Sequence, residues 1–211
     1  MEKLFAIGDI HGCFDKLRSL MAQLRVNKER DTLIFLGDYI DRGPQSMDVV
    51  DYLIRLPQHG YHAVFLKGNH EAMFQDYLKG RDKFTFLVNG GSETLDNYMQ
   101  NIDRSKGVVI PPSHTEFFKS LRLYYETDSY IFVHAGLAPK VPLDQQREKE
   151  LLWVRDSFVH STYDFGKIVI FGHTPFKKPL VTKNKIGIDT GAVYGNQLTC
   201  IELPAQKFYH A

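Results

Sequence analysis

Residues 32–43 read TLIFLGDYIDRG. The first five, Thr32–Leu36, form an apolar run with the length of a buried strand, and Asp38, Asp41 and Arg42 come directly after it. In open α/β sheets, side chains that follow the carboxyl ends of strands form the binding site. This stretch therefore predicts a buried strand that ends in a functional loop, and the rest of the chain can be compared with it.

Four further segments repeat the arrangement of an apolar run followed at once by polar side chains. The runs are Leu4–Ile7, Ala63–Leu66, Tyr130–Val133 and Ile168–Phe171, and the polar segments after them are GDIHG (8–12), GNHE (68–71), HAG (134–136) and GHT (172–174). Because the ends of neighbouring strands share one edge of a sheet, we expect these segments to converge on one point.

The organisation between these segments favours an α/β protein. Apolar residues recur at helical spacing after the first two strands, so the first eighty residues predict a β-α-β-α-β series with mostly parallel strands. Residues 84–125 predict a helical insertion, with a helix over Ser92–Met99 and a capping box of Ser113 and Glu116. The last third, including Leu198–Leu203, predicts a second, mixed or antiparallel sheet. No linker divides the chain, so we expect a single domain over residues 1–211.

Composition excludes several classes of protein. Of the 211 residues, 43% are hydrophobic and 24% are charged, which is ordinary for a soluble domain, and the formal net charge of +1 gives no support for nucleic-acid or membrane-surface binding. The sequence has no signal-peptide pattern and only two cysteines, Cys13 and Cys200, too few for a disulfide framework. We therefore expect a cytoplasmic protein.

The polar segments supply a set of metal ligands. Carboxylate, imidazole and amide oxygen together suit a borderline divalent ion, most simply Mn, with Fe or Zn as alternatives. A carboxylate can bridge two ions, and ligands at the tips of several strands can hold two ions about 3.5–4 Å apart, as in enzymes that hydrolyse phosphate esters. The expected ligands are Asp9, His11, Asp38, Asn69, His134 and His173.

A second set of residues suits the phosphate and the leaving group. Arg42 and Arg155 have guanidinium groups that can donate bidentate hydrogen bonds to phosphate oxygens. His70 follows the expected ligand Asn69 directly and is better placed as a general acid that protonates the departing oxygen, with Asp41 orienting it. Glu71 is assigned to the orientation of the ligands.

Five motifs in this order resemble the metallophosphoesterase superfamily and, within it, the PPP-type serine/threonine protein phosphatases of the compact bacterial and phage kind. The blocks are GDxHG, GDxxDRG, GNHE, HAG and GHT, the segment LLWVR (151–155) brings in the second arginine, and the resemblance runs from Leu4 to Thr199. It implies a two-sheet β-sandwich flanked by helices, a dinuclear Mn/Fe/Zn centre with the same six ligands, and direct attack by a metal-bridging hydroxide.

The substrate expected from this resemblance is a protein or peptide phosphorylated on serine or threonine, with phosphotyrosine as a further candidate. Symmetrical diadenosine tetraphosphate hydrolases are similar around the metals, but they usually carry glutamine at the position of His11, so His11 favours the protein phosphatases. A dinucleoside polyphosphate hydrolase or a broad phosphoesterase is the alternative. A non-catalytic metal-binding module is a third, disfavoured because each catalytic position holds a competent residue.

Overall fold

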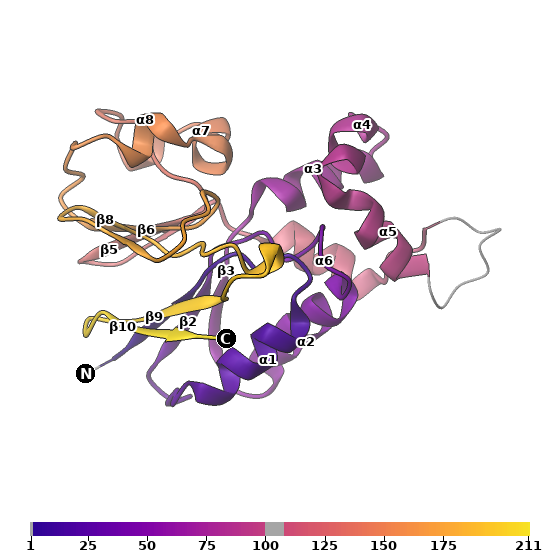
Figure 1. The fold of residues 1–211 in the computed structure, drawn as a ribbon, viewed down its shortest axis with the longest axis horizontal. Coiled ribbons are helices and arrows are strands. Elements are labelled where there is room, and N and C mark those ends of the chain that lie inside the picture. The colour runs from indigo at the N-terminus through magenta and orange to yellow at the C-terminus, as the bar shows by residue number, and fades with distance from the viewer. Residues whose placement is uncertain (1, 100–107) are drawn as a thin grey trace.

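The computed structural model describes residues 2–99 and 108–211, and its strands form two five-stranded sheets (Figure 1). The first sheet has the order β10-β9-β1-β2-β3, in which β1, β2 and β3 are parallel while β9 and β10 are antiparallel to their neighbours. Its strands are β1 (Leu4–Ile7), β2 (Thr32–Phe35), β3 (His62–Phe65), β9 (Thr199–Leu203) and β10 (Lys207–His210).

The second sheet has the order β4-β5-β6-β8-β7. The three central strands β5, β6 and β8 are parallel, and the edge strands β4 and β7 are antiparallel to them. Its strands are β4 (Tyr124–Glu126), β5 (Tyr130–Val133), β6 (Ile168–Phe171), β7 (Leu180–Val181) and β8 (Lys185–Gly187). The predicted α/β architecture of two mixed sheets flanked by helices is thus confirmed.

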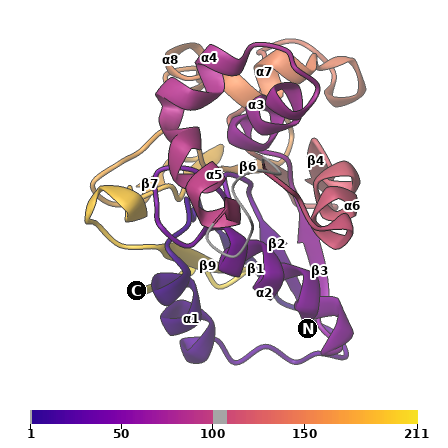
Figure 2. The ribbon, with the colours of Figure 1, turned by 90° about the vertical axis from the view of Figure 1, so that its right-hand side faces the viewer.

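The helices cover the outer faces of the two sheets. Figure 1 shows α1 and α2 along the first sheet and α7 and α8 over the second. Figure 2 shows α3, α4 and α5 grouped next to one another. The α-helices are α1 (Phe14–Gln23), α2 (Ser46–Gln58), α3 (Asn69–Leu78), α4 (Lys83–Phe86), α5 (Ser92–Met99), α6 (Pro112–Ser120), α7 (Glu148–Trp153) and α8 (Asp156–Val159). Shorter turns are η1 (Leu87–Gly91), η3 (Leu143–Gln145) and η4 (Ala192–Tyr194).

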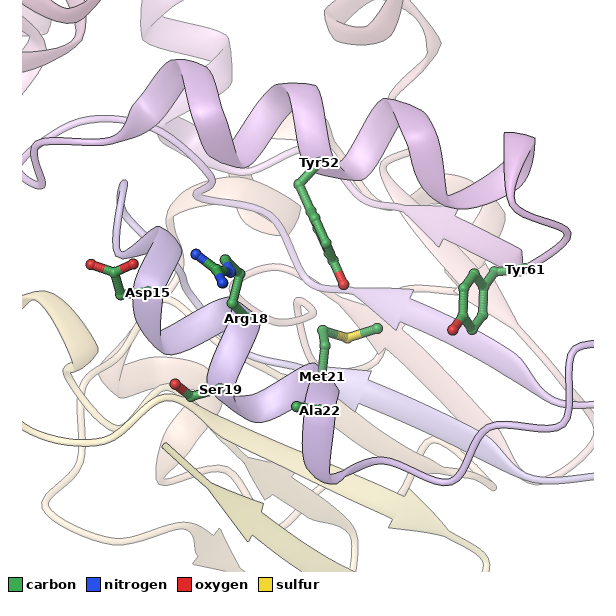
Figure 3. Close-up of a pocket in the computed structure, with 7 residues that line it drawn as sticks. All are labelled: Asp15, Arg18, Ser19, Met21, Ala22, Tyr52 and Tyr61. Atoms are coloured by element: carbon green, nitrogen blue, oxygen red, sulfur yellow. The ribbon is translucent and has the colours of Figure 1, made fainter.

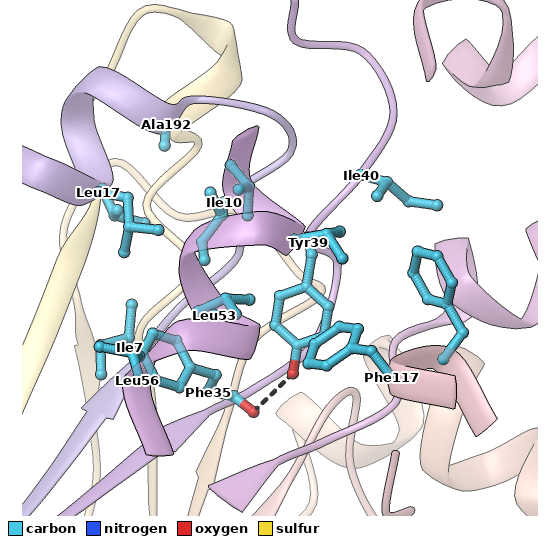
Figure 4. Packing of buried hydrophobic residues seen from close by; sticks show 14 of the residues in the cluster. Ile7, Ile10, Leu17, Phe35, Tyr39, Ile40, Leu53, Leu56, Phe117 and Ala192 are labelled. Carbon is cyan, nitrogen blue, oxygen red and sulfur yellow. Dashed lines mark hydrogen bonds between the residues drawn. The ribbon is translucent and has the colours of Figure 1, made fainter. Parts of the chain in front are cut away.

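Strand periodicity explains why both faces of the first sheet are buried. Successive side chains of a strand point to opposite faces, so Phe5 and Ile7 pack toward the helices while Ala6 packs between the sheets. The helix-side core includes Tyr39, whose hydroxyl donates to the carbonyl oxygen of Leu66 at 2.6 Å. The same hydroxyl lies 3.3 Å from the carbonyl oxygen of Phe35, the contact marked in Figure 4. These bonds anchor the loop after β2 in the core.

One strand prediction needs correction, and one strand was not predicted. We expected Leu198–Leu203 in the second sheet, but β9 pairs antiparallel with β1 in the first, where Leu4 lies opposite Leu203. The pattern was misleading because proximity in sequence does not determine which sheet edge a strand joins. The final strand β10 was not predicted; it pairs with β9 through a short turn.

The expected insertion at 84–125 is helical over α4, α5 and α6, but its last residues are strand, because β4 begins at Tyr124. Residues 100–107 of it lie outside the described residues. The predicted capping box is wrong: α6 already begins at Pro112, so Ser113 lies inside the helix and no side chain caps it. Proline is well suited to the first turn, where its missing N–H costs nothing.

No helix within residues 2–99 and 108–211 combines the length and the hydropathy needed to cross a bilayer. Both cysteines are free thiols, and Cys200 is buried in β9. The expectation that neither belongs to a disulfide is therefore confirmed.

Candidate metal centre

The loops that follow β1, β2, β5 and β6 and the first turn of α3 converge, and two groups of side chains could hold a metal ion there. One group is His11, Asp38 and His70, and the other is Asp38, His134 and His173; all of them are buried. Asp38 belongs to both groups, which is what a ligand that bridges two ions requires.

Two of the histidines are oriented as metal ligands usually are. The Nδ1 atoms of His11 and His134 lie 2.9 Å and 2.8 Å from the carbonyl oxygens of Ile40 and Leu36. A ring that donates from Nδ1 presents a lone pair at Nε2. Each Nε2 lies 3.4 Å from an oxygen of Asp38. Burial lowers the pKa of His134 and lowers that of His11 to about 3, so both rings are neutral and a cation between them and Asp38 fits.

His173 provides the strongest sign that something else binds here. Its Nε2 atom is buried and has no hydrogen-bond partner among the described residues, as is also true of the Thr174 hydroxyl. Burial lowers the pKa of His173 to about 2, so the ring carries a free lone pair. Because buried polar atoms are nearly always paired, a divalent cation accounts for this nitrogen.

The other two expected ligands lie at the same place without belonging to either group. The Asn69 side-chain oxygen is 3.0 Å from Nε2 of His134. Both carboxylate oxygens of Asp9 accept a hydrogen bond from the backbone N–H of His173, at 3.1 and 3.0 Å. All six expected ligands are therefore brought together, and their roles remain predictions.

Backbone conformation marks these loops as strained. Eight non-glycine residues within 2–99 and 108–211 have positive φ, and five of them are site residues: His11, Asp38, Asp41, Arg42 and His173. Each such residue costs of order 1–3 kcal/mol, and strain of this kind clusters at functional sites. The loops therefore hold these side chains in positions that an unstrained turn would not provide.

The expected general acid and its partner are in contact. Nδ1 of His70 lies 2.6 Å from Asp41 Oδ2. Burial lowers the pKa of His70, but Asp38 and Asp41 outweigh it and the net pKa is raised. The other oxygen of Asp41 accepts a 2.6 Å hydrogen bond from the hydroxyl of Thr94, and the backbone N–H of Asp41 donates to the oxygens of Thr94 and Ser46. This network keeps His70 oriented and proton-bearing.

Thr94 contacts the expected site residue Asp41, and the sequence did not reveal it. It lies on α5, so the insertion contributes directly to the site rather than only packing beside it. The helix was predicted, but which of its residues faces Asp41 depends on tertiary packing, and Ser46 in the first turn of α2 was missed for the same reason.

Glu71 holds two loops together, which sharpens its expected role. One oxygen of its carboxylate accepts from the backbone N–H groups of Asp38 and Gly68, both at 2.9 Å, and the other accepts from that of Tyr39 at 2.8 Å. Burial raises the pKa of Glu71 to about 8, whereas three N–H donors favour the ionised carboxylate. We assign it as ionised, since a carboxyl proton would compete with these donors. Gly68 is required here because a Cβ would collide with the Asp38 carboxylate.

The two arginines flank the cluster. Arg42 donates from Nη1 to Nε2 of His11 at 2.7 Å, a bond that an ion on this nitrogen would replace, and its backbone N–H donates to Gly90 O at 3.0 Å. Gly90 adopts φ +94° in η1 and leaves no room for a Cβ beside Arg42. Arg155 is charged and close enough to depress the pKa of His173 and His134, although burial is the larger cause for both. Arg42 therefore contacts the cluster directly and Arg155 influences it through its charge, and their role in phosphate binding remains a prediction.

Comparison with known proteins places the chain in a family. The model of the calcineurin-like phosphoesterases matches residues 3–199. The chain belongs to the calcineurin-like phosphoesterase family. A member of this family hydrolyses phosphate esters at a centre of two divalent ions, and the two groups that share Asp38 could hold such ions.

Within the family, individual relatives carry different names. The chain is 31% identical to bis(5'-nucleosyl)-tetraphosphatase PrpE [asymmetrical] of Anoxybacillus flavithermus, covering 95% of this chain and 90% of the relative. It is 30% identical to serine/threonine-protein phosphatase 1 of Salmonella typhimurium, covering 93% and 89%. A crystal structure provisionally described as a diadenosine tetraphosphatase matches with a TM-score of 0.76 at 23% identity, over 99% of this chain and 92% of that one. This last likeness concerns the fold alone.

Proposed function

We propose that this calcineurin-like phosphoesterase hydrolyses dinucleoside polyphosphates asymmetrically, releasing unequal nucleotides. The observation that carries the proposal is the full-length similarity to the tetraphosphatase of Anoxybacillus flavithermus, which covers 90% of that relative. The proposal revises our expectation from sequence in two ways: it prefers the nucleotide alternative to the protein phosphatase, and asymmetrical to symmetrical cleavage.

The residues of the site have separate tasks in this reaction. Asp9, His11, Asp38, Asn69, His134 and His173 would hold two ions, for which we propose manganese, with iron or zinc as alternatives. When bound, the ions supply activation of water and neutralisation of phosphate charge. Arg42 and Arg155 would donate bidentate hydrogen bonds to the phosphate oxygens. His70, held by Asp41 at 2.6 Å, would donate its Nε2 proton to the departing oxygen.

One observation favours a second candidate, a serine/threonine protein phosphatase. The departing group of a polyphosphate is itself a phosphate, whose second pKa is about 6, so it needs little protonation. A serine or threonine alkoxide needs a proton far more, and the chain has a well-ordered acid in the His70, Asp41 and Thr94 network. Phosphomonoester hydrolysis is therefore the function to test beside the first.

The test is to incubate the manganese-loaded protein with diadenosine tetraphosphate and with phosphoserine and phosphothreonine peptides. Initial rates of AMP, ADP, ATP and phosphate release are measured together. Equal amounts of AMP and ATP with slower peptide turnover are expected. ADP as the main product would make the cleavage symmetrical, and fast peptide turnover without nucleotide products would replace the proposal with the second candidate.

A further inference from the structure

A groove runs along the outer face of α3, the helix whose first turn carries Asn69 and His70. A cavity of ≈ 460 Å³ between α3 and α7 adjoins another of ≈ 380 Å³ between α3 and α6, and the two share Lys67, Gln75 and Lys79. In both ribbon views α3 lies between α7 and α6 (Figure 1, Figure 2). We name these joined cavities the α3 groove.

Two of the helices that line the α3 groove, α3 and α7, reach the site at one end. The first turn of α3 carries Asn69, His70 and Glu71, and its later turns line the groove. The last residue of α7 is Trp153, which lines the groove while its indole meets the ring of His173 edge-on, with the centroids 6.3 Å apart. Trp153 therefore links the lining of the groove to the ring of His173 in the site.

The α3 groove is rich in positive charge. Five of its lining side chains are cationic and two are acidic, although the whole chain has a net charge of only +1. Lys67 is paired with Glu148 at 2.8 Å and Arg81 with Asp76 at 2.5 Å. Lys79 and Lys149 are exposed and form no ion pair with any carboxylate that the structure describes. These two ammonium groups are available to an anionic ligand.

Trp153 adds an aromatic surface to this charge. It is the one tryptophan of the chain, and 41% of it is exposed. An exposed indole beside lysines is the combination that binds nucleotides by stacking on the base and pairing with the phosphates. Figure 3 shows another pocket, between α1 and α2, with Arg18, Tyr52 and Tyr61; among the described residues, none of the aromatic rings that line it packs against a histidine of the metal groups, as Trp153 does.

We infer that the α3 groove is the subsite for the nucleotide that lies beyond the scissile phosphate, with Trp153 against its base and Lys79 and Lys149 against its phosphates. The inference rests on the proposed nucleotide substrate. It assigns to the α3 groove the selection of a nucleoside polyphosphate over a simple phosphate ester.

A direct binding test uses Trp153 as the reporter. The metal-loaded protein is mixed in a stopped-flow fluorimeter with ATP or with inorganic tripolyphosphate, which has similar charge but no base. ATP is expected to quench the tryptophan fluorescence and tripolyphosphate is not. Equal quenching by both, or none by ATP in a protein that hydrolyses diadenosine tetraphosphate, overturns the inference.

A kinetic test uses the double substitution Lys79→Gln/Lys149→Gln. Loss of two exposed ion pairs should lower kcat/KM for diadenosine tetraphosphate by about 3- to 30-fold, chiefly through KM, while p-nitrophenyl phosphate turnover is unchanged. The matched control is Lys28→Gln/Lys183→Gln, which removes the same charge from exposed positions outside the groove. Equal losses in the two double variants, or a selective loss on phosphopeptides, overturn the inference.

These outcomes separate the inference from the proposed function. If ATP quenches Trp153 and the Lys79/Lys149 variant weakens that binding, but diadenosine tetraphosphate is not hydrolysed, the nucleotide subsite stands and the proposed reaction fails. If diadenosine tetraphosphate is hydrolysed and the variant behaves as its control does, the reaction stands and the subsite fails.

Discussion

The loop after β2 and the loop after β6 enter the same site but differ in how their side chains are held. In the first, Asp41 is bonded to His70 and Thr94, and the backbone of Asp38 is bonded to Glu71. In the second, the Nε2 atom of His173 and the hydroxyl of Thr174 are buried without a partner among the described residues.

The difference shows that the site is preorganised by the protein on one side and completed by its ligand on the other. The loop after β2 reaches its working geometry through hydrogen bonds within the chain, so changes there should reduce catalysis even when ions are bound. The loop after β6 has a buried nitrogen, Nε2 of His173, that no described residue satisfies and that a bound ion would satisfy, so the order of this loop should depend on metal. The following predictions examine that contrast.

The largest effect is expected on the side of the loop after β2, from His70→Asn. Loss of a general acid should lower kcat by about 10²–10⁴-fold on substrates with poor leaving groups, and much less on p-nitrophenyl phosphate, whose leaving group needs little protonation. The measurement is kcat on an alkyl and an aryl phosphate. Equal losses on both would refute the general-acid role.

Metal removal should act on the loop after β6. A ligand at a hundredfold excess over its Kd stabilises the folded state by about 2.7 kcal/mol, so chelation should lower Tm by roughly 5–10 °C in a protein of this size. Amide hydrogen exchange should rise more at residues 172–174 than at residues 38–42. Uniform exchange in both loops would remove the contrast.

Glu71→Gln tests the hydrogen bonds that join Asp38, Tyr39 and Gly68. The amide retains one acceptor oxygen but turns an N–H group toward a donor, which leaves a backbone donor unpaired. Substitutions of this kind lower metal affinity or activity by about 10–100-fold. Manganese affinity by calorimetry is the readout. Glu93→Gln on α5, exposed and away from these bonds, is the matched control.

The smallest effect is expected from Thr94→Val, which removes the hydrogen bond that α5 donates to Asp41 and the one that it accepts from the backbone N–H of Asp41. That N–H keeps the hydroxyl of Ser46 as an acceptor. One net hydrogen bond of about 1 kcal/mol corresponds to a loss of about fivefold in kcat. Ser92→Ala, on the exposed side of the same helix, should leave kcat unchanged. Loss of activity in both variants to the same extent would mean that α5 acts only through its packing.

The sequence predicted what depends on local pattern. The five predicted apolar runs correspond to β1, β2, β3, β5 and β6 within one residue of their expected bounds. The polar segments that follow these strands lie together at the candidate metal centre. This worked because strand length, burial and the direction of parallel strands are all encoded in neighbouring residues.

What the sequence did not predict depends on contacts between distant segments. Thr94 meets Asp41 across 53 positions, and Gly90 meets Arg42 through a kink in η1. The partner of β9 could not be chosen because its strand pattern suits either sheet. The start of α6 was misjudged because the proline pair at Pro111 and Pro112 outweighed the cap signal of Ser113.

The pairing of β9 with β1 has a consequence for the synthesis of the protein. Leu4 lies opposite Leu203, so β1 is made well before β9 and gains this neighbour only after all the segments between them have been synthesised. Until then one edge of the growing sheet is open, and unpaired edges invite association with other chains. We therefore expect the nascent chain to be most prone to aggregation between the completion of β3 and the arrival of β9.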